Sequence, residues 1–309
     1  MPFRKIAIAG ASGSSNGFSL GNVIAHRLLE EKARGVFDDV LILGRKESAK
    51  SKSAVAKEFI KAGARYVNVD YADPKEVADV LRGSDCVLSC VAVQDPQAIA
   101  ESERVLVEGA KLAGTVRRFF PSKYGPDDEN LPQLSDIGKR KKRIGDLLAE
   151  VGISQTNVIT GIFLDAVYTD FIMKFVDEGK DRGARGVTVG DGKGQVMGIS
   201  MEDIASYIVA MLTDPDESKT HNKTVRIVGA AWKAGEWPEV FRKATGRDVK
   251  VTNYVQRDAV KAGAVYPVLL QRGDFYIKPE VWDNAKWPQV KPSNLEEYTR
   301  KRFSSQASA

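Results

Sequence analysis

Two periodicities alternate along the first half of this 309-residue chain, and this alternation is the strongest constraint on its fold. Short apolar runs rich in β-branched residues are typical of buried strands, and we expect them at residues 5–9, 40–44, 66–69, 86–93, 118–121 and 155–160. Stretches with apolar residues at helical spacing separate these runs, at residues 20–32, 54–62, 74–81, 99–113 and 139–151. Strands that alternate with helices build βαβ units around a parallel sheet. The sequence therefore predicts an α/β fold with a doubly wound parallel sheet of the Rossmann type.

The alternation becomes irregular after residue 160. Residues 179–194 are rich in Gly, Asp and Lys and are expected to form a surface loop with a short strand, and Ser200 is expected to cap the helix that follows. Later helices are expected at 204–212 and 237–245, and later strands at 225–228 and 249–253. This change predicts a Rossmann domain at residues 1–160 and a smaller C-terminal α/β lobe at 161–309, whose late segments return to the Rossmann sheet.

Composition narrows the class of protein. The chain is 43% apolar and carries a net charge of +5, so it can bury a core, and it has no apolar run of the roughly 20 residues that cross a bilayer. The basic run at 139–143 could contact nucleic acid, but no motif that reads nucleic acid accompanies it. Cys86 and Cys90 are too few for a disulfide framework or a zinc site. We expect a cytoplasmic protein, monomeric or homodimeric, without a metal, a membrane partner or a nucleic-acid partner.

A glycine-rich turn follows the first expected strand. Gly10, Ser12 and Gly13 lie directly after the strand, and a helical pattern begins a few residues later. The pyrophosphate of a dinucleotide needs close approach of the backbone, free N–H groups and a helix N-terminus, and a glycine allows that approach because it has no Cβ. We therefore expect these residues to bind a dinucleotide. The alternative is an ordinary glycine turn.

The third glycine of such a turn is displaced in this chain. Gly17 and Gly21 are the candidates, and we interpret residues 14–18 as a local insertion after which Gly21 belongs to the start of the helix.

The end of the second expected strand indicates which dinucleotide binds. Arg45 and Lys46 stand where an acidic residue would hold the ribose of NAD, and a guanidinium fork suits a 2′-phosphate. We expect NADPH, although these cations could instead be solvated loop residues. Asp70, at the end of the third strand, is expected near the adenine, and Ala92 and Val93, at the end of the fourth, near the nicotinamide.

Hydride transfer commonly needs a partner for the proton. The Tyr-x-x-x-Lys pair of ordinary short-chain dehydrogenases matches only Tyr71 and Lys75, which come too early and enclose a proline. Instead, residues 118–125 read Arg-Phe-Phe-Pro-Ser-Lys-Tyr-Gly, followed by a lysine-bearing helix.

With this stretch, the sequence resembles the atypical short-chain dehydrogenases/reductases that include NmrA-like proteins and isoflavone reductase-like enzymes. The resemblance covers roughly residues 3–250 and is carried by the glycine turn, the cation after the second strand, and the motifs at 118–125, 160–163 and 190–205. It implies binding of NADPH, with Gly161 and Phe163 among the contacts.

The resemblance also implies a lysine that acts as general acid/base beside the nicotinamide. Counting back from the Gly-Ile pair after the helix, Lys141 falls in that position. An amine works near neutral pH only if its pKa is lowered, which partial burial and the neighbouring Lys139, Lys142 and Arg143 would achieve. The alternatives are that Lys141 only contacts the cofactor, or that the whole run is an exposed helix face or a nuclear localisation sequence.

Ser122 and Tyr124 are the next catalytic candidates, because their hydroxyls can bind a carbonyl or phenol oxygen of a substrate. Lys123 stands where members of the family often carry an acidic residue, and the insertion at 14–18 is a second departure. The sequence thus predicts an NADPH-dependent reductase of a small aromatic or polyketide-like substrate. The alternatives are a non-catalytic NADP(H)-binding redox sensor of the NmrA type and, less favoured, a protein that acts on nucleic acid.

Overall fold

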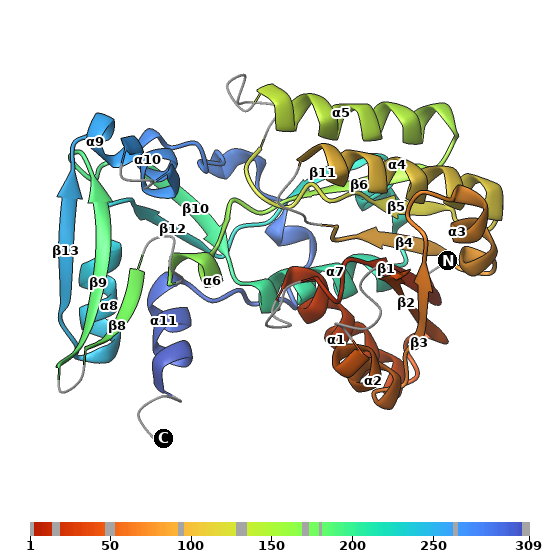
Figure 1. Cartoon of the computed structure of the whole chain (residues 1–309), viewed down its shortest axis with the longest axis horizontal. Coiled ribbons are helices and arrows are strands. Elements are labelled where there is room, and N and C mark those ends of the chain that lie inside the picture. The colour runs from red at the N-terminus through yellow and green to blue at the C-terminus, as the bar shows by residue number, and fades with distance from the viewer. Residues whose placement is uncertain are drawn as a thin grey trace. The chain divides into compact units, whose positions relative to one another are not determined.

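The computed structural model describes residues 3–13, 19–46, 53–91, 96–127, 135–168, 173–178, 181–261 and 265–304 (Figure 1). The chain forms two compact units. The first comprises Met1–Lys123, Asp128–Val158 and Ala205–Val225, and the second comprises Tyr124–Asp127, Ile159–Ile204 and Arg226–Ala309. Each unit is therefore assembled from several separate stretches of the chain.

A sheet of seven strands, counted over the described residues, forms the centre of the first unit. Its strands are β1 (Lys5–Ala9), β2 (Asp39–Arg45), β3 (Arg65–Val69), β4 (Cys86–Ser89), β5 (Arg118–Phe120), β6 (Ser154–Ile159) and β11 (Lys223–Arg226). The order is β11-β6-β5-β4-β1-β2-β3, and the pairs from β3 through β6 are all parallel. This is the strand order of a doubly wound Rossmann sheet, so the predicted fold class is confirmed.

Helices cover both faces of this sheet, as Figure 1 shows. They are α1 (Leu20–Ala33), α2 (Ser53–Lys61), α3 (Pro74–Leu81), α4 (Pro96–Ala113), α5 (Ser135–Glu150) and the later part of α7 (Met201–Thr213). Side chains of α3, α4 and α5, including Val77, Val105 and Leu148, share one buried cluster with Leu41 and Val87 of the strands. Burial on both faces explains why the central strands β1, β2 and β4 are largely apolar rather than alternating.

Local capping fixes where two of these helices begin. Ser19 precedes α1 and its Oγ accepts the N–H of Asn22 at 3.3 Å. Asp73 precedes α3, with Pro74 as the first helical residue, and its carboxylate accepts the N–H of Lys75 at 2.9 Å. Side-chain caps and proline at the first helical position are both strong helix-start signals.

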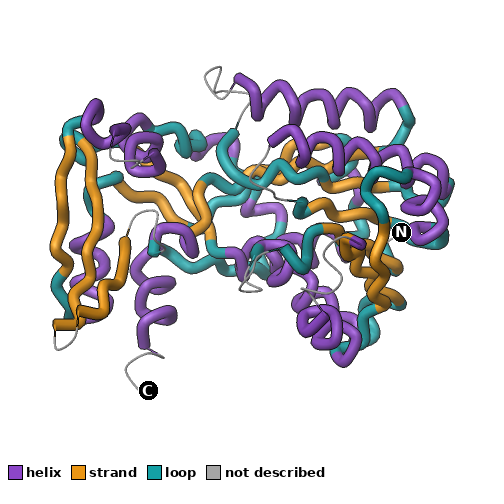
Figure 2. The backbone as a smooth tube through the Cα atoms, viewed as in Figure 1, coloured by secondary structure: helices purple, strands orange, loops and turns teal. Residues whose placement is uncertain are grey.

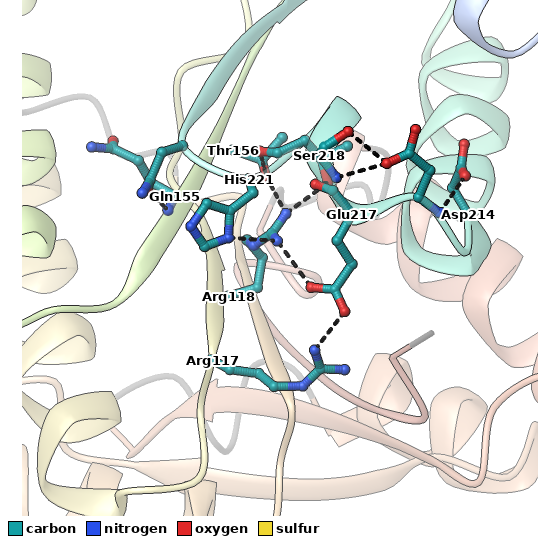
Figure 3. Close-up of polar contacts among 11 residues, drawn as sticks. Arg117, Arg118, Gln155, Thr156, Asp214, Glu217, Ser218 and His221 are labelled. Atoms are coloured by element: carbon teal, nitrogen blue, oxygen red, sulfur yellow. Dashed lines mark hydrogen bonds and ion pairs between the residues drawn. The ribbon is translucent and has the colours of Figure 1, made fainter. Parts of the chain in front are cut away.

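The buried guanidinium of Arg118 lies at the amino end of β5 (Figure 3). It donates to the hydroxyls of Thr220 at 2.6 Å and Thr156 at 3.2 Å, and to the carboxylate of Glu217 at 3.2 Å. Its Nη2 also lies 3.4 Å from Nδ1 of His221. Arg118 therefore ties the short 3-10 helix at Glu217–Lys219 to the sheet.

The second unit contains two three-stranded sheets, counted over the described residues (Figure 2). Their strands are β7 (Ile162–Phe163), β10 (Gln195–Ile199) and β12 (Ala230–Lys233) in one sheet, and β8 (Met173–Glu178), β9 (Asp181–Val189) and β13 (Val249–Tyr254) in the other. The helices are α6 (Leu164–Val167), α8 (Trp237–Thr245), α9 (Gln256–Lys261), α10 (Val265–Arg272) and α11 (Leu295–Ser304). An apolar cluster around Trp237, Phe241 and Phe303 forms the core of this unit.

Three sequence expectations need correction. The stretch 179–194 is not mainly a loop, because β9 spans nine residues and pairs with both β8 and β13. The strand expected at 225–228 ends at Arg226, and the strand expected at 86–93 ends at Ser89. In β9 the partner strand β13 lies more than 60 residues away in the sequence, so local propensity gave no signal of the pairing.

The expected cap at Ser200 is confirmed. Its Oγ accepts the N–H of Asp203 at 3.1 Å and donates to the carboxylate of the same residue at 2.7 Å, which starts α7 at Met201. No helix within the described ranges has both the length and the apolar character to cross a membrane.

Candidate active site

Three glycines bring the turn after β1 and the start of α1 against the end of β4. Gly10 has a φ of +88°, and a Cβ there would lie 2.3 Å from the carbonyl oxygen of Cys90. A Cβ on Gly21, in the first turn of α1, would lie 2.6 Å from the carbonyl oxygen of Gly10, and one on Gly13 would lie 3.1 Å from the same atom. Only glycine fits at Gly10 and Gly21, so the turn and the helix start approach each other as a pyrophosphate site requires. Gly17 lies outside the described residues.

The N-terminus of α1 carries the partial positive charge of the helix dipole, which attracts an anion. The first turn of this 14-residue helix contains no acidic side chain, and the dipole of the helix favours a negative group at this end. Ser12, which is buried beside this turn, accepts a long hydrogen bond of 3.5 Å from the hydroxyl of Tyr66. The residues present therefore fit a dinucleotide pyrophosphate.

The cations at the end of β2 differ in their surroundings. Arg45 is the last residue of the strand, its Nη2 donates to the hydroxyl of Ser102 at 3.4 Å, and its guanidinium lies 5.4 Å from the centre of the Tyr71 ring. Lys46 is exposed and forms an ion pair with Glu76 at 2.6 Å, which raises the pKa of Lys46. Arg45 is thus held in place, whereas Lys46 would have to leave a carboxylate to reach a phosphate.

Asp70 stabilises the turn that follows β3. Its carboxylate accepts the N–H of Ala72 at 2.8 Å and so shapes the turn into α3. Ala92 and Val93, the residues expected near the nicotinamide, lie outside the described residues.

The carboxyl end of β5 gathers the polar groups that could handle a proton. The Oγ of Ser122 donates to the carbonyl of Val91 at 3.2 Å, just after β4, and its N–H donates to the carboxylate of Glu103 at 2.7 Å. From α5, the ammonium of Lys141 donates to the carbonyl of Lys123 at 3.4 Å. The end of β5 therefore brings Ser122 and Lys141 into one region of the first unit.

The basic run on α5 is not one uniform exposed face. Lys141 is half-buried, whereas the side chain of Lys142 is 74% exposed and pairs with Asp146 at 2.7 Å, and Arg143 is also exposed. The amphipathic pattern of α5 points Ile144 and Leu148 into the core, and Lys141 lies one turn before them. Lys141 therefore differs from its neighbours in what it touches.

Three predicted site residues belong to the second unit. They are Tyr124, Gly161 and Phe163. The N–H groups of Thr160 and Gly161 both donate to the carbonyl of Gly125, at 3.1 and 2.9 Å. Gly161 has a φ of +65°, and a Cβ there would lie 2.1 Å from the carbonyl oxygen of Met197. This backbone crossing therefore needs a glycine whether or not it contacts a cofactor.

Sequence reasoning missed Glu103. This carboxylate is only 3% exposed, on a face of α4 that is otherwise apolar. Its signal was present in the sequence, because Glu103 precedes Leu106 and Val107 by three and four residues and so shares their buried face.

Comparison with known proteins identifies the family and supports the fold. The model of the NmrA-like family matches residues 3–273 of the chain. An isoflavone reductase homolog of Zea mays is 28% identical, covering 80% of this chain and 84% of the maize protein. The fold is similar to the complex of leucoanthocyanidin reductase with NADPH from Vitis vinifera, with a TM-score of 0.78 and 20% identity over 97% of this chain and 99% of that one. It is also similar to AtPrR2 with NADP+ and (+)-pinoresinol, with a TM-score of 0.74 and 22% identity over 97% and 99% of the two chains. The protein is a member of the NmrA-like family.

Proposed function

We propose that this protein is an NADPH-dependent reductase of a small aromatic or polyketide-like substrate, and that Lys141 handles the proton. One observation carries the proposal: among the cations of α5 whose side chains the structure describes, Lys141 is the half-buried one, and it reaches the carboxyl end of β5. Similar proteins that are named isoflavone reductase, leucoanthocyanidin reductase and pinoresinol reductase support the choice of an aromatic substrate.

The first unit supplies the residues that would hold NADPH. Gly10, Gly13 and Gly21, with Ser12, would leave room for the pyrophosphate at the N-terminus of α1. Arg45 would bind the 2′-phosphate, since Ser102 and Tyr71 already hold its planar fork at the end of β2. When bound, NADPH supplies a hydride to an unsaturated or carbonyl carbon.

The protein's own side chains would then manage oxygen and proton. Lys141, in its protonated form, would donate a proton to the oxygen or carbon that becomes electron-rich when the substrate accepts the hydride. The hydroxyl of Ser122 would orient the substrate oxygen, and we assign the same task to the hydroxyl of Tyr124. Gly161 and Phe163 remain proposed cofactor contacts on the family resemblance.

The test is NADPH oxidation, followed by absorbance, across a panel of phenolic enones, isoflavones, lignans and quinones. We expect turnover of at least one aromatic substrate, and a loss of about 100-fold or more in kcat for Lys141→Ala with NADPH affinity changed little. The matched control is Lys142→Ala, which removes a neighbouring cation that pairs with Asp146 at the surface.

Two outcomes would contradict the proposal. Tight NADP(H) binding without turnover of any substrate would favour the redox-sensor alternative. Equal losses in Lys141→Ala and Lys142→Ala would show that the charge of the helix matters rather than the position of Lys141.

A further inference from the structure

Glu103 is a buried carboxylate that the proposed chemistry does not yet use. It lies on α4, is 3% exposed, and accepts the N–H of Ser122 at 2.7 Å. Acidic side chains are almost never fully buried without a partner, because removing a carboxylate from water costs several kcal/mol. Its burial therefore calls for compensating groups nearby.

Those groups converge on Glu103 from three other parts of the first unit. Ser122 follows β5, Ser89 ends β4, and the ammonium groups of Lys141 and Lys123 supply opposite charge from α5 and from the segment after β5. Burial raises the pKa of the Glu103 carboxyl, while the Ser122 N–H, the Ser89 side chain and the two lysines act in the opposite direction. Lys123 is itself buried, so two cations and one carboxylate share a region screened from water.

A chain of contacts links this region to the glycine turn. Gly10 lies against the Cys90–Val91 backbone, where a Cβ would approach within 2.3 Å. The carbonyl of Val91 accepts the hydroxyl of Ser122, and the N–H of Ser122 is held by Glu103. Helices α4 and α5, which carry Glu103 and Lys141, lie side by side (Figure 1). Glu103 thus accepts a hydrogen bond from the backbone at the end of β5 and interacts electrostatically with the lysines there.

We propose that Glu103 is a positioning residue of this site, which holds the β5 end at Ser122 and supplies the negative charge that faces Lys141 and Lys123. The inference rests on the proposed function for the role of Lys141, but the charge coupling is independent of it. A nearby carboxylate favours the charged form of an amine, so Glu103, when it is ionised, favours the protonated form of Lys141 and limits how far burial can lower the pKa of that amine.

The other charged groups near Lys141 on α5, among the side chains that the structure describes, do not replace this carboxylate. Lys142 is neutralised at the surface by Asp146, and Lys139 and Arg143 are exposed to solvent, where water screens them. Lys123 carries a like charge and therefore acts on Lys141 in the opposite direction to Glu103.

The test compares Glu103→Gln with Glu101→Gln. Glutamine has nearly the same shape and can still accept the Ser122 N–H, so Glu103→Gln removes mainly the charge. Glu101→Gln removes the same charge from the exposed side of α4, where Glu101 pairs with Arg104. The readout is the rate at which an acylating reagent labels Lys141 of the full chain as a function of pH, quantified by peptide mass spectrometry.

We expect the labelling midpoint of Lys141 to fall by about one pH unit in Glu103→Gln, which makes labelling roughly tenfold faster below the midpoint. Glu101→Gln should match the wild type. An unchanged Lys141 profile in folded Glu103→Gln would overturn the proposal. If that variant does not fold, Glu103→Met serves instead, because it also removes the charge with a side chain of similar length, and an unchanged midpoint of Lys141 would equally overturn the proposal.

The labelling needs no substrate, so the two proposals can fail separately. A shifted Lys141 profile in a protein that turns over no substrate would leave Glu103 as assigned and reject the reductase. Turnover that depends on Lys141, together with a Lys141 labelling profile that Glu103→Gln leaves unchanged, would support the reductase and reject the role assigned to Glu103.

Discussion

Two residues of the motif at 118–125 lie at opposite ends of β5 and have different structural roles. Arg118, at the amino end, is buried and ties β5 to the segment around Thr220. Ser122, just past the carboxyl end, contacts Glu103 and the end of β4. The motif therefore combines an anchor for the fold with a candidate site residue.

The carboxylate of Glu217 is expected to stabilise the fold in a way that depends on pH. Burial alone would raise its pKa, but hydrogen bonding and charge from Arg117 and other cations lower the pKa of Glu217 to about 2. The unfolded value is near 4.5, so the ionised carboxylate stabilises the fold fully above about pH 4.5, and this contribution is lost as the pH falls through about 2. Glu217→Gln should therefore cost about 1–2 kcal/mol at pH 7, after allowance for partial exposure, and almost nothing at pH 2.

Urea unfolding of Glu217→Gln and wild type between pH 2 and pH 7 measures this difference. The control is Glu239→Gln, whose carboxylate is 64% exposed and pairs with Arg242 within one helix, and it should change stability little at any pH. A difference between Glu217→Gln and wild type that stays constant with pH would show that Glu217 acts by shape rather than charge.

Helices and strands that are determined by nearby residues could be predicted from the sequence, whereas those determined by distant partners could not. Helix α1 was expected at 20–32 and spans Leu20–Ala33, because a cap residue and helical spacing lie within one stretch of sequence. The sequence predicts only a short strand where β9 spans nine residues, because pairing with β8 and β13 determines its length and its own residues include Gly, Asp and Arg. Lys141 is proposed from the family resemblance, whereas the contact between Glu103 and Ser122 joins two elements and has no local sequence pattern.

Gly21, at the start of α1, is expected to be required for both stability and NADPH binding. Alanine is a better helix former than glycine by about 1 kcal/mol, so propensity alone predicts that Gly21→Ala stabilises α1. However, a Cβ at Gly21 would lie 2.6 Å from the carbonyl oxygen of Gly10 and 2.9 Å from Cβ of Cys90. We therefore expect Gly21→Ala to destabilise the protein by about 2 kcal/mol and to weaken NADPH binding at least tenfold.

Gly145→Ala in α5 is the matched control for this substitution. The nearest atom to its Cβ would be the amide oxygen of Gln155 at 3.2 Å, the end of a flexible side chain that can move. Its stability should stay equal or rise by up to about 1 kcal/mol. Chemical unfolding measures the stability of both variants, and titration measures their affinity for NADPH. If Gly21→Ala changed neither quantity, the close approach of α1 to the turn would not be required.

At the scale of the whole molecule, each unit is built from segments that are distant in the sequence. The first unit takes residues 205–225, and the second takes residues 124–127 from the middle of the Rossmann half. The alternation of strands and helices predicted the sheet and its parallel strands, because each βαβ unit is local. Which late segments join which unit depends on contacts such as those of Arg118 with Thr220, more than 100 residues apart, and these have no periodic signal.

Cofactor preference can be measured through the stability of the whole molecule. A ligand that binds only the folded state stabilises it by RT ln(1 + [L]/Kd), about 2.7 kcal/mol at 100 times Kd, which raises the melting temperature of a chain of this size by roughly 5 °C. Because Arg45 is held at the end of β2 by Ser102 and Tyr71, NADPH should stabilise far more than NADH at equal concentration. In Arg45→Ala this difference should largely disappear, while Lys46→Ala should keep most of it, since Lys46 is paired with Glu76. Equal melting temperatures with NADPH and NADH in the wild type would reject Arg45 as the ligand of the 2′-phosphate.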